Sequence, residues 1–275
     1  MILQLRGISK TYRTKTEQGD VNALTPLDLD IEEGELVSFV GPSGCGKSTL
    51  LNIVAGLLPA TTGEVIFDGD LMTEPSRRVG FMFQKPVLLP WRTVRKNVLL
   101  PSEVFGSEST ELGDKVDEVL DVVGLADFAN ALPQHLSGGM QQRVALARVL
   151  VYEPRMLLMD EPFGALDEFT REAMNLELLR LTGPAGITVL FVTHSISEAI
   201  FLADRVVVMS SRPGRISGVV DVPFGSDRQI SIMHDPAFTD LVFEVRGLLG
   251  DSAVEDSETV SPDPGLSGGE RQTNG

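Results

Sequence analysis

The feature that most constrains this chain is a glycine-rich loop between an apolar run and a helical pattern. The run covers residues 36–40, and the loop matches the pattern G-x-x-x-x-G-K-[ST]. Apolar residues then recur at helical spacing from Leu50 to Val54. Strand, loop and helix in this order predict a phosphate site at the edge of a parallel sheet. The loop consists of Gly41, Pro42, Ser43, Gly44, Cys45, Gly46, Lys47, Ser48 and Thr49.

The residue types of this loop suit a bound nucleotide. Glycines let successive backbone N–H groups point at phosphate oxygens, and the following helix adds its positive end. We expect Lys47 to reach the β- and γ-phosphates and the Ser48 hydroxyl to coordinate Mg²⁺. The alternative, a glycine-rich turn that matches by chance, does not account for the flanking strand and helix.

Further apolar runs at 156–159, 188–192 and 206–209 alternate with helical stretches. The pattern predicts an α/β fold with a largely parallel sheet. Residues 2–8 and 64–67 are expected to form an antiparallel β flank.

Composition and periodicity divide the rest of the chain into a helical lobe, a further helix and a tail. A helical lobe inserted at about 86–150 is predicted because no strand pattern occurs there. Asp235 and Pro236 open a further helix. The prediction is one domain over 1–250, followed by an acidic, disordered tail over 251–275.

Two carboxylates and a histidine follow buried strands. Asp160 and Glu161 end the run that begins at Met156, and His194 follows the run that begins at Thr188. Ligands collect at the carboxyl ends of parallel strands. We therefore expect Asp160 to hold Mg²⁺, Glu161 to act as general base, and His194 to contact the γ-phosphate. Adjacent carboxylates are also common in turns, and it is the phosphate loop that favours the catalytic interpretation.

Composition limits the partners. The chain has 39 acidic and 23 basic residues, a net charge of −16, which argues against nucleic acid as a partner. No stretch has the roughly 20 apolar residues of a membrane span. The N-terminus has no signal-peptide pattern, and the lone cysteine excludes an internal disulfide. Any membrane role is therefore expected to come through a partner.

The stretch at 136–143, LSGGMQQR, is similar to the signature motif of the ABC ATPase family. Its serine and glycines are expected to open an apolar helix over 141–151, which gives a second phosphate-binding helix end. Other segments resemble the family in the same order, over about residues 2–250. Gln84 resembles the Q-loop glutamine, Asp167 the D-loop aspartate and Tyr12 the aromatic residue that stacks on adenine. The signature residues that would bind phosphate are Ser137, Gly138 and Gly139.

The resemblance implies an ATPase that uses ATP and Mg²⁺ as a head-to-tail homodimer. Lys47, Gln84, Glu161 and His194 would be catalytic, and Gln84 would join Ser48 and Asp160 around the metal. The dimer would bind two membrane-spanning permease subunits, with an extracytoplasmic solute-binding protein in the complex. The expected location is the cytoplasmic face of the inner membrane.

Two stretches, 83–94 and 211–216, resemble the nitrate, sulfonate and taurine importer branch of that family. Import is favoured over export because separate ATPase chains are the usual importer layout. The resemblance does not select one substrate: nitrate, sulfonates, taurine, bicarbonate and pyrimidine precursors are all alternatives. For Trp91 we weigh a partner-facing role against core packing.

Two alternatives come from other functional classes. One is an ABC-type switch that acts on ribosomes or DNA, which the single phosphate loop and the negative charge disfavour. The other is an inactive regulator, which the presence of the expected catalytic residues disfavours.

Two details yield separate hypotheses. A second LSGG at 266–269 has no room for a helix behind it, so we expect a decoy whose removal with residues 251–275 leaves ATPase activity nearly intact. Cys45 lies in the phosphate loop, and its alkylation would block nucleotide binding unless it only fills a variable position.

Overall fold

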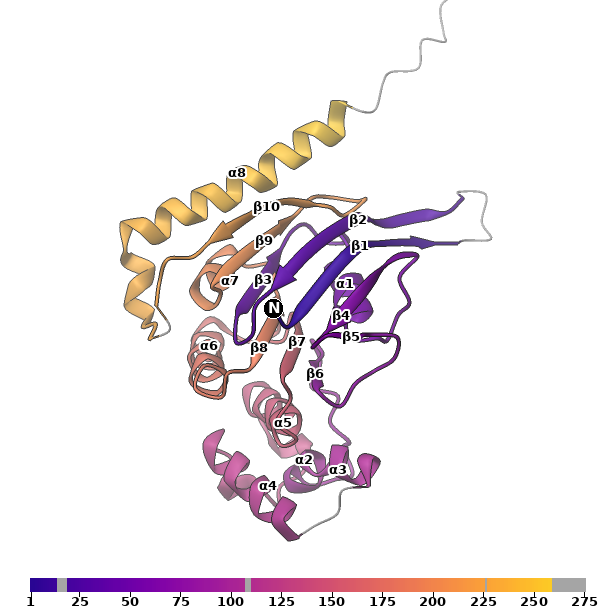
Figure 1. Cartoon of the computed structure of the whole chain (residues 1–275). Coiled ribbons are helices and arrows are strands. Elements are labelled where there is room, and N and C mark those ends of the chain that lie inside the picture. The colour runs from indigo at the N-terminus through magenta and orange to yellow at the C-terminus, as the bar shows by residue number, and fades with distance from the viewer. Residues whose placement is uncertain (14–18, 107–109, 226, 259–275) are drawn as a thin grey trace, which may run out of the picture.

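The strands of this chain form a six-stranded and a four-stranded sheet (Figure 1). The computed structural model describes residues 1–13, 19–106, 110–225 and 227–258. The larger sheet has the order β10-β9-β3-β8-β7-β6, parallel except for the antiparallel edge strand β10. The α/β prediction is confirmed. The strands are β3 (Leu36–Val40), β6 (Val79–Met82), β7 (Met156–Asp160), β8 (Thr188–Val192), β9 (Arg205–Met209) and β10 (Ile216–Asp221).

Alternate residues of the central strands face two different hydrophobic clusters. In β7, Leu157 and Met159 face the cluster shared with the helices at 138–150, 168–182, 196–202 and 236–258. Met156 and Leu158 face the cluster shared with the helix at 47–54 and the smaller sheet. Burial on both faces is the reason that these strands are continuous apolar runs.

The smaller sheet is antiparallel, with the order β2-β1-β4-β5. Leu3 of β1 lies opposite Phe67 of β4, so the predicted β flank is confirmed. Strands β1 and β4 are longer than the predicted residues 2–8 and 64–67, and the other two strands of this sheet were not predicted. They are β1 (Leu3–Tyr12), β2 (Val21–Ile31), β4 (Thr62–Phe67) and β5 (Asp70–Leu71).

Helices occupy the chain between β6 and β7, at the bottom of Figure 1. Val98, Val116, Leu120 and Val144 join them in a third hydrophobic cluster. In the described ranges no strand lies in this segment. The elements are α2 (Val94–Val98), α3 (Leu100–Phe105), α4 (Thr110–Val122), η1 (Ala126–Phe128), η2 (Pro133–His135) and α5 (Gly138–Leu150).

The remaining helices pack on the larger sheet and its edge. Helix α8 crosses β10 and β9, and Gly218 leaves room for Leu248, since a Cβ there would lie 2.8 Å from the leucine Cδ1. The prediction of disorder from residue 251 is wrong for 251–258, because α8 continues to Glu258. The second LSGG lies outside the described residues. These helices are α1 (Lys47–Val54), α6 (Glu168–Thr182), α7 (Ile196–Leu202), η3 (Ile230–His234) and α8 (Pro236–Glu258).

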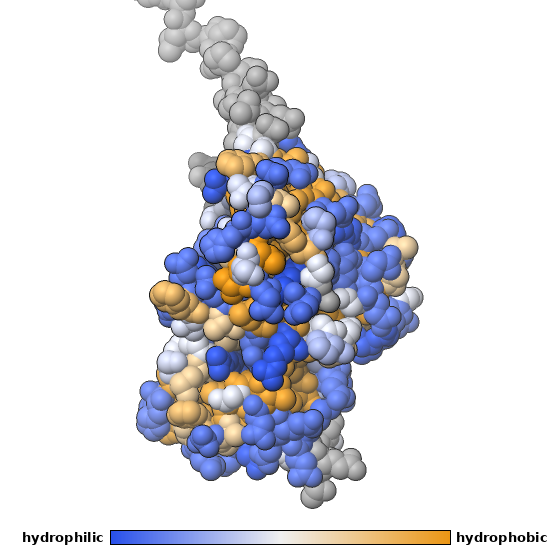
Figure 2. Space-filling model, turned by 90° about the vertical axis from the view of Figure 1, so that its left-hand side faces the viewer, coloured by the Kyte–Doolittle hydropathy of each residue, from blue (hydrophilic) through white to orange (hydrophobic). Residues whose placement is uncertain are grey.

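One face of the molecule carries mostly hydrophilic residues, with apolar patches between them (Figure 2). Over the described residues, the structure contains no helix with the length and apolar character needed to cross a bilayer.

Candidate functional site

The phosphate loop joins the end of β3 to the start of α1. Gly46 precedes the helix with φ 98°, and a Cβ on it would lie 2.5 Å from Leu24 Cδ2, so both its backbone and its surroundings require glycine. Gly41 is equally confined, because a Cβ there would lie 2.7 Å from the Met209 carbonyl oxygen. The loop thus curls tightly enough to turn its backbone toward a phosphate group.

Lys47 lies within the curl of this loop. Its Nζ donates hydrogen bonds to the carbonyl oxygens of Gly41 at 2.7 Å and Pro42 at 3.1 Å, and the residue is only 6% exposed. The ammonium group is therefore held at the centre of the loop. A bound polyphosphate would supply competing anionic oxygens at this point.

A pocket of about 250 Å³ opens beside the loop. Tyr12 stands at its mouth, with its hydroxyl 3.3 Å from Thr49 Oγ1. Arg212 adds a second cation; it was not predicted as a site residue, although it lies in the stretch 211–216 that resembles the importer branch. The lining residues are Tyr12, Val21, Ala23, Ser43, Gly44, Gly46, Lys47, Ser48, Thr49, Glu161 and Arg212.

Two of the three residues expected to hold Mg²⁺, Ser48 and Asp160, are in direct contact. Ser48 Oγ donates a hydrogen bond to Asp160 Oδ1 over 2.9 Å. Burial, followed by the Glu161 charge, raises the pKa of Asp160, while the Ser48 hydroxyl and the Lys47 charge partly oppose this shift. A hydroxyl and a carboxylate beside a phosphate site are oxygen ligands that suit Mg²⁺. The donor set therefore fits this ion.

Three of the predicted catalytic side chains meet at one oxygen atom. Gln84 Nε2 lies 3.4 Å and His194 Nδ1 lies 3.6 Å from Glu161 Oε2. Glu161 has φ 46°, an uncommon value for a non-glycine residue, and its N–H donates to the Val192 carbonyl at 2.9 Å. The end of β8 thus fixes the backbone that presents this carboxylate.

Helix α5 holds the segment that carries Gln84. Gln142 Nε2 donates to the Gln84 carbonyl at 2.9 Å, and Arg148 donates to the carbonyls of Pro86 and Val87, both at 2.8 Å. Burial lowers the pKa of Arg148. Neither Gln142 nor Arg148 was predicted from the sequence to be a functional residue. Both residues lie in the helix that the signature motif opens, and this position is the sequence feature that could have identified them.

The signature residues lie at the start of α5. The helix begins at Gly138, not at 141, and Ser137 caps it by accepting a hydrogen bond from Met140 N at 3.3 Å. A Cβ on Gly139 would lie 2.6 Å from Thr170 Cγ2, so the helix packs tightly on α6. Within the described ranges, none of Ser137, Gly138 and Gly139 lines the phosphate-loop pocket of the same chain.

Asp167 caps α6 and does not line that pocket in the described part of the chain. Its carboxylate accepts hydrogen bonds from Thr170 N at 3.0 Å and Thr170 Oγ1 at 2.7 Å. These bonds lower the pKa of Asp167.

The hypothesis that alkylation of Cys45 controls nucleotide binding is not supported. Cys45 is 1% exposed and packs in the cluster that contains Leu24 and Phe39. A reagent has no access to a thiol in this position. The structure favours the alternative, in which Cys45 is a small residue that fills space.

Trp91 is displayed at the surface, 73% exposed, so core packing is excluded for it. Asn97, which is fully buried, shapes the loop that carries the tryptophan. Its Nδ2 donates to the carbonyls of Leu89, Arg92 and Thr93, and its Oδ1 accepts from Leu89 N at 2.7 Å.

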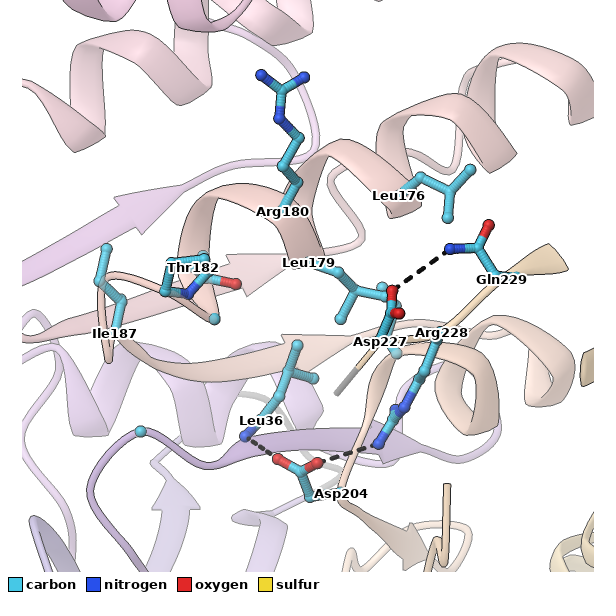
Figure 3. A pocket seen from close by; sticks show the side chains of 14 residues that line it. Leu36, Leu176, Leu179, Arg180, Thr182, Ile187, Asp204, Asp227, Arg228 and Gln229 are labelled. Atoms are coloured by element: carbon cyan, nitrogen blue, oxygen red, sulfur yellow. Dashed lines mark hydrogen bonds and ion pairs between the residues drawn. The ribbon is translucent and has the colours of Figure 1, made fainter. Parts of the chain in front are cut away.

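A larger cavity, of about 710 Å³, lies at the opposite ends of the parallel strands, where β3 and β8 begin (Figure 3). There Asp204 accepts hydrogen bonds from Leu36 N at 2.9 Å and from Arg228 Nη2 at 3.0 Å. Arg228 also donates to the carbonyls of Phe201 and Ala203, and burial lowers its pKa. This arginine is occupied by the protein itself, and the cavity is separate from the phosphate-loop pocket.

Comparison with known proteins agrees with this geometry. Residues 24–164 match the family described as ABC transporter. The chain is 43% identical over 257 residues to a taurine import ATP-binding protein, TauB, of Jannaschia sp. (strain CCS1), covering 92% of this chain and 96% of the relative. It is 43% identical over 221 residues to an aliphatic sulfonates import ATP-binding protein, SsuB, of Bacillus cereus (strain ATCC 10987 / NRS 248), covering 80% and 86%.

A solved structure has the same fold. The dimeric ATP-binding cassette MJ0796, in a post-hydrolysis state bound to ADP and Pi, superposes with a TM-score of 0.71. It is 37% identical and covers 82% of this chain and all of its own. With the phosphate loop and the carboxylates already located, these matches show that the chain is an ATPase of the ABC transporter family.

Proposed function

We propose that this chain powers uptake of a small sulfonate such as taurine by hydrolysing ATP at sites shared between two copies. The observation that carries the proposal is the convergence of Gln84 and His194 on one Glu161 oxygen beside the phosphate loop. The relatives named for taurine and aliphatic sulfonate import support this substrate class. They disfavour a switch that acts on ribosomes or DNA.

In this proposal each side chain has a separate role in hydrolysis. Lys47 binds the β- and γ-phosphates, and Tyr12 stacks on the adenine. Glu161 takes a proton from the attacking water, and His194 and Gln84 position the reacting groups around it. Ser48, Asp160 and Gln84 would hold Mg²⁺. When bound, this ion neutralises the charge on the phosphate oxygens.

The site is completed by a second copy of the chain. Ser137, Gly138 and Gly139 open α5 but do not line the pocket of their own chain within the described ranges. A helix N-terminus with free N–H groups is a phosphate site. We infer that these residues close over the ATP held by the partner's phosphate loop, as a head-to-tail homodimer in which Asp167 lies near the shared site. The dimeric structure of MJ0796 supports such an assembly.

Coupling to transport requires membrane subunits. We propose that Trp91 contacts one of two permease subunits at the cytoplasmic face of the membrane, and that an extracytoplasmic solute-binding protein selects the substrate. The exposed tryptophan on a loop fixed by buried Asn97 supports this contact. Exposed aromatic side chains are typical anchors of protein interfaces.

The test uses Glu161→Gln, which keeps the shape of the side chain and removes the base. With ATP and Mg²⁺ we expect a stable dimer by light scattering and an ATPase rate at least about 100-fold below wild type. Glu118→Gln, on the exposed side of α4, is the control and should behave as wild type. Wild-type turnover by Glu161→Gln would refute the assigned base, and a monomer in ATP would refute the shared site.

A further inference from the structure

We propose that Glu198 is a positioning residue for His194, acting through a ring of hydrogen bonds that fixes the backbone on both sides of the histidine. The inference rests on the proposed role of His194 in hydrolysis. It assigns a function to a buried carboxyl group. Within the described part of the chain, this group does not line the phosphate-loop pocket and has no hydrogen bond to Glu161.

The ring is built from three residues. Thr193 Oγ1 donates a hydrogen bond to Glu198 Oε2 and accepts one from Ser195 N at 3.0 Å. Ser195 Oγ in turn accepts a hydrogen bond from Glu198 N at 3.3 Å and caps α7. Both neighbours of His194 in the sequence are therefore tied to Glu198. The peptide units around the histidine cannot rotate without breaking one of these bonds.

Burial distinguishes the ring from the side chain that it supports. Thr193 is 2% and Glu198 is 6% exposed, whereas the His194 side chain is 60% exposed. A mostly exposed imidazole has little packing to hold it. Its position 3.6 Å from Glu161 therefore depends on the backbone that carries it.

The ring is also connected to the catalytic base. Thr193 N donates to the Phe39 carbonyl of β3 at 3.2 Å, and Glu161 N donates to the Val192 carbonyl at 2.9 Å. The strand end that carries His194 thus also holds the backbone of Glu161. A disturbance of the ring would change the separation between the two side chains.

A carboxyl group at this place is costly for the fold. Burial raises the pKa of Glu198, against the hydrogen bond from Thr193 and the charges of Arg171 and His194. Its Oε1 is buried without a hydrogen-bond partner among the described residues. Such a cost is consistent with a role in the site that offsets it.

The test combines Glu198 variants with His194→Ala and measures kcat and KM for ATP. Glu198→Ala should lower kcat by about 10- to 100-fold with little change in KM, because displacement of His194 from its position slows the chemical step. Glu198→Gln keeps an oxygen that accepts from Thr193 and should restore most of the rate. In the His194→Ala background, Glu198→Ala should cost no further activity, because the residue that it positions is already absent.

Thr193→Val removes the hydroxyl at nearly constant volume and should reproduce the loss of kcat. Thr182→Val is the matched control, since Thr182 is also buried and, among the described residues, its hydroxyl donates to the Leu178 carbonyl within α6. Its kcat should stay at the wild-type value. Thermal unfolding of each variant separates a loss of fold from a loss of rate.

The outcomes separate the two proposals. If His194→Ala hydrolyses ATP at the wild-type rate, the proposed role of His194 fails, and the positioning role fails with it. If His194→Ala is impaired and Glu198→Ala is not, only the positioning role is overturned. An equal loss from Glu198→Ala in both backgrounds would also overturn it, because Glu198 would then act independently of His194.

Discussion

Ser48 and Asp160 are joined by a 2.9 Å hydrogen bond although 112 positions separate them in the chain. Ser48 belongs to the loop that follows β3, and Asp160 ends β7, with β8 between the two strands in the sheet. The parallel arrangement brings both strand ends to one edge. The two oxygen donors that we propose as Mg²⁺ ligands are therefore held next to each other by the fold.

Asp160→Asn should abolish Mg²⁺-dependent hydrolysis while leaving the nucleotide-free fold as stable as wild type or more so. Because the pKa of Asp160 is raised in the folded protein, its ionised form at neutral pH opposes folding, and a neutral amide removes that cost. The measurement is thermal unfolding in EDTA beside the ATPase rate. Asp167→Asn is the control, with the opposite expected effect on stability. Because the pKa of Asp167 is lowered in the folded protein, its ionised form stabilises the fold, and the substitution should reduce stability. A drop in stability for Asp160→Asn would contradict the argument.

Asn97→Ala should destabilise the fold by about 3 kcal/mol, because it leaves buried backbone groups of the Trp91 loop without partners. Asn97 makes four hydrogen bonds to that loop. Urea unfolding monitored by tryptophan fluorescence reports the change. Asn22→Ala, at an exposed position, should alter stability by no more than about 0.5 kcal/mol. Equal stability of the two variants would show that the loop does not depend on Asn97.

Trp91→Ala should leave the isolated ATPase unchanged in fold and basal rate, because the side chain is exposed. Binding to the permease subunits should weaken by at least about tenfold, the cost of removing an aromatic anchor. Phe243→Ala on α8 is the matched control, being 63% exposed and remote from that loop in the sequence. Co-purification of each variant with the permease tests the contact, and undiminished recovery of Trp91→Ala would argue against it.

Arg148→Met should lower kcat by about tenfold through the Gln84 segment. The substitution leaves the carbonyls of Pro86 and Val87 without their guanidinium donor, while the hydrogen bond from Gln142 to the Gln84 carbonyl remains. ATPase kinetics provide the measurement. Arg180→Met, on a side chain that is 70% exposed, should keep the wild-type rate. Matching rates for the two variants would exclude this role for Arg148.

Deletion of residues 259–275 should leave both the ATPase rate and the melting temperature unchanged. Deletion of 251–275 should also keep the rate, although it removes the last eight residues of α8 together with the second LSGG. ATPase assays and thermal unfolding of the two truncated chains are the measurement. A collapse of activity in the shorter deletion would show that the second LSGG is functional.

The C-terminal helix illustrates where composition misleads. Glycine and acidic residues after position 250 predicted disorder, yet α8 runs on to Glu258. The start of the helix at Asp235 and Pro236 was predicted, and Phe238 and Val245 are buried in the turns that follow. Intrinsic preference is a weak guide where a helix is already nucleated by packing along its earlier turns.

The phosphate loop, the strand runs and the carboxylates that follow them could be predicted from the sequence, because each is a contiguous pattern whose local geometry implies its chemistry. The folded chain was needed to show that Gln84 and His194 meet at one oxygen of Glu161 and that Arg148 donates to the segment that follows Gln84. These contacts join residues far apart in the chain. Their geometry depends on strand order and helix packing, which no local pattern encodes.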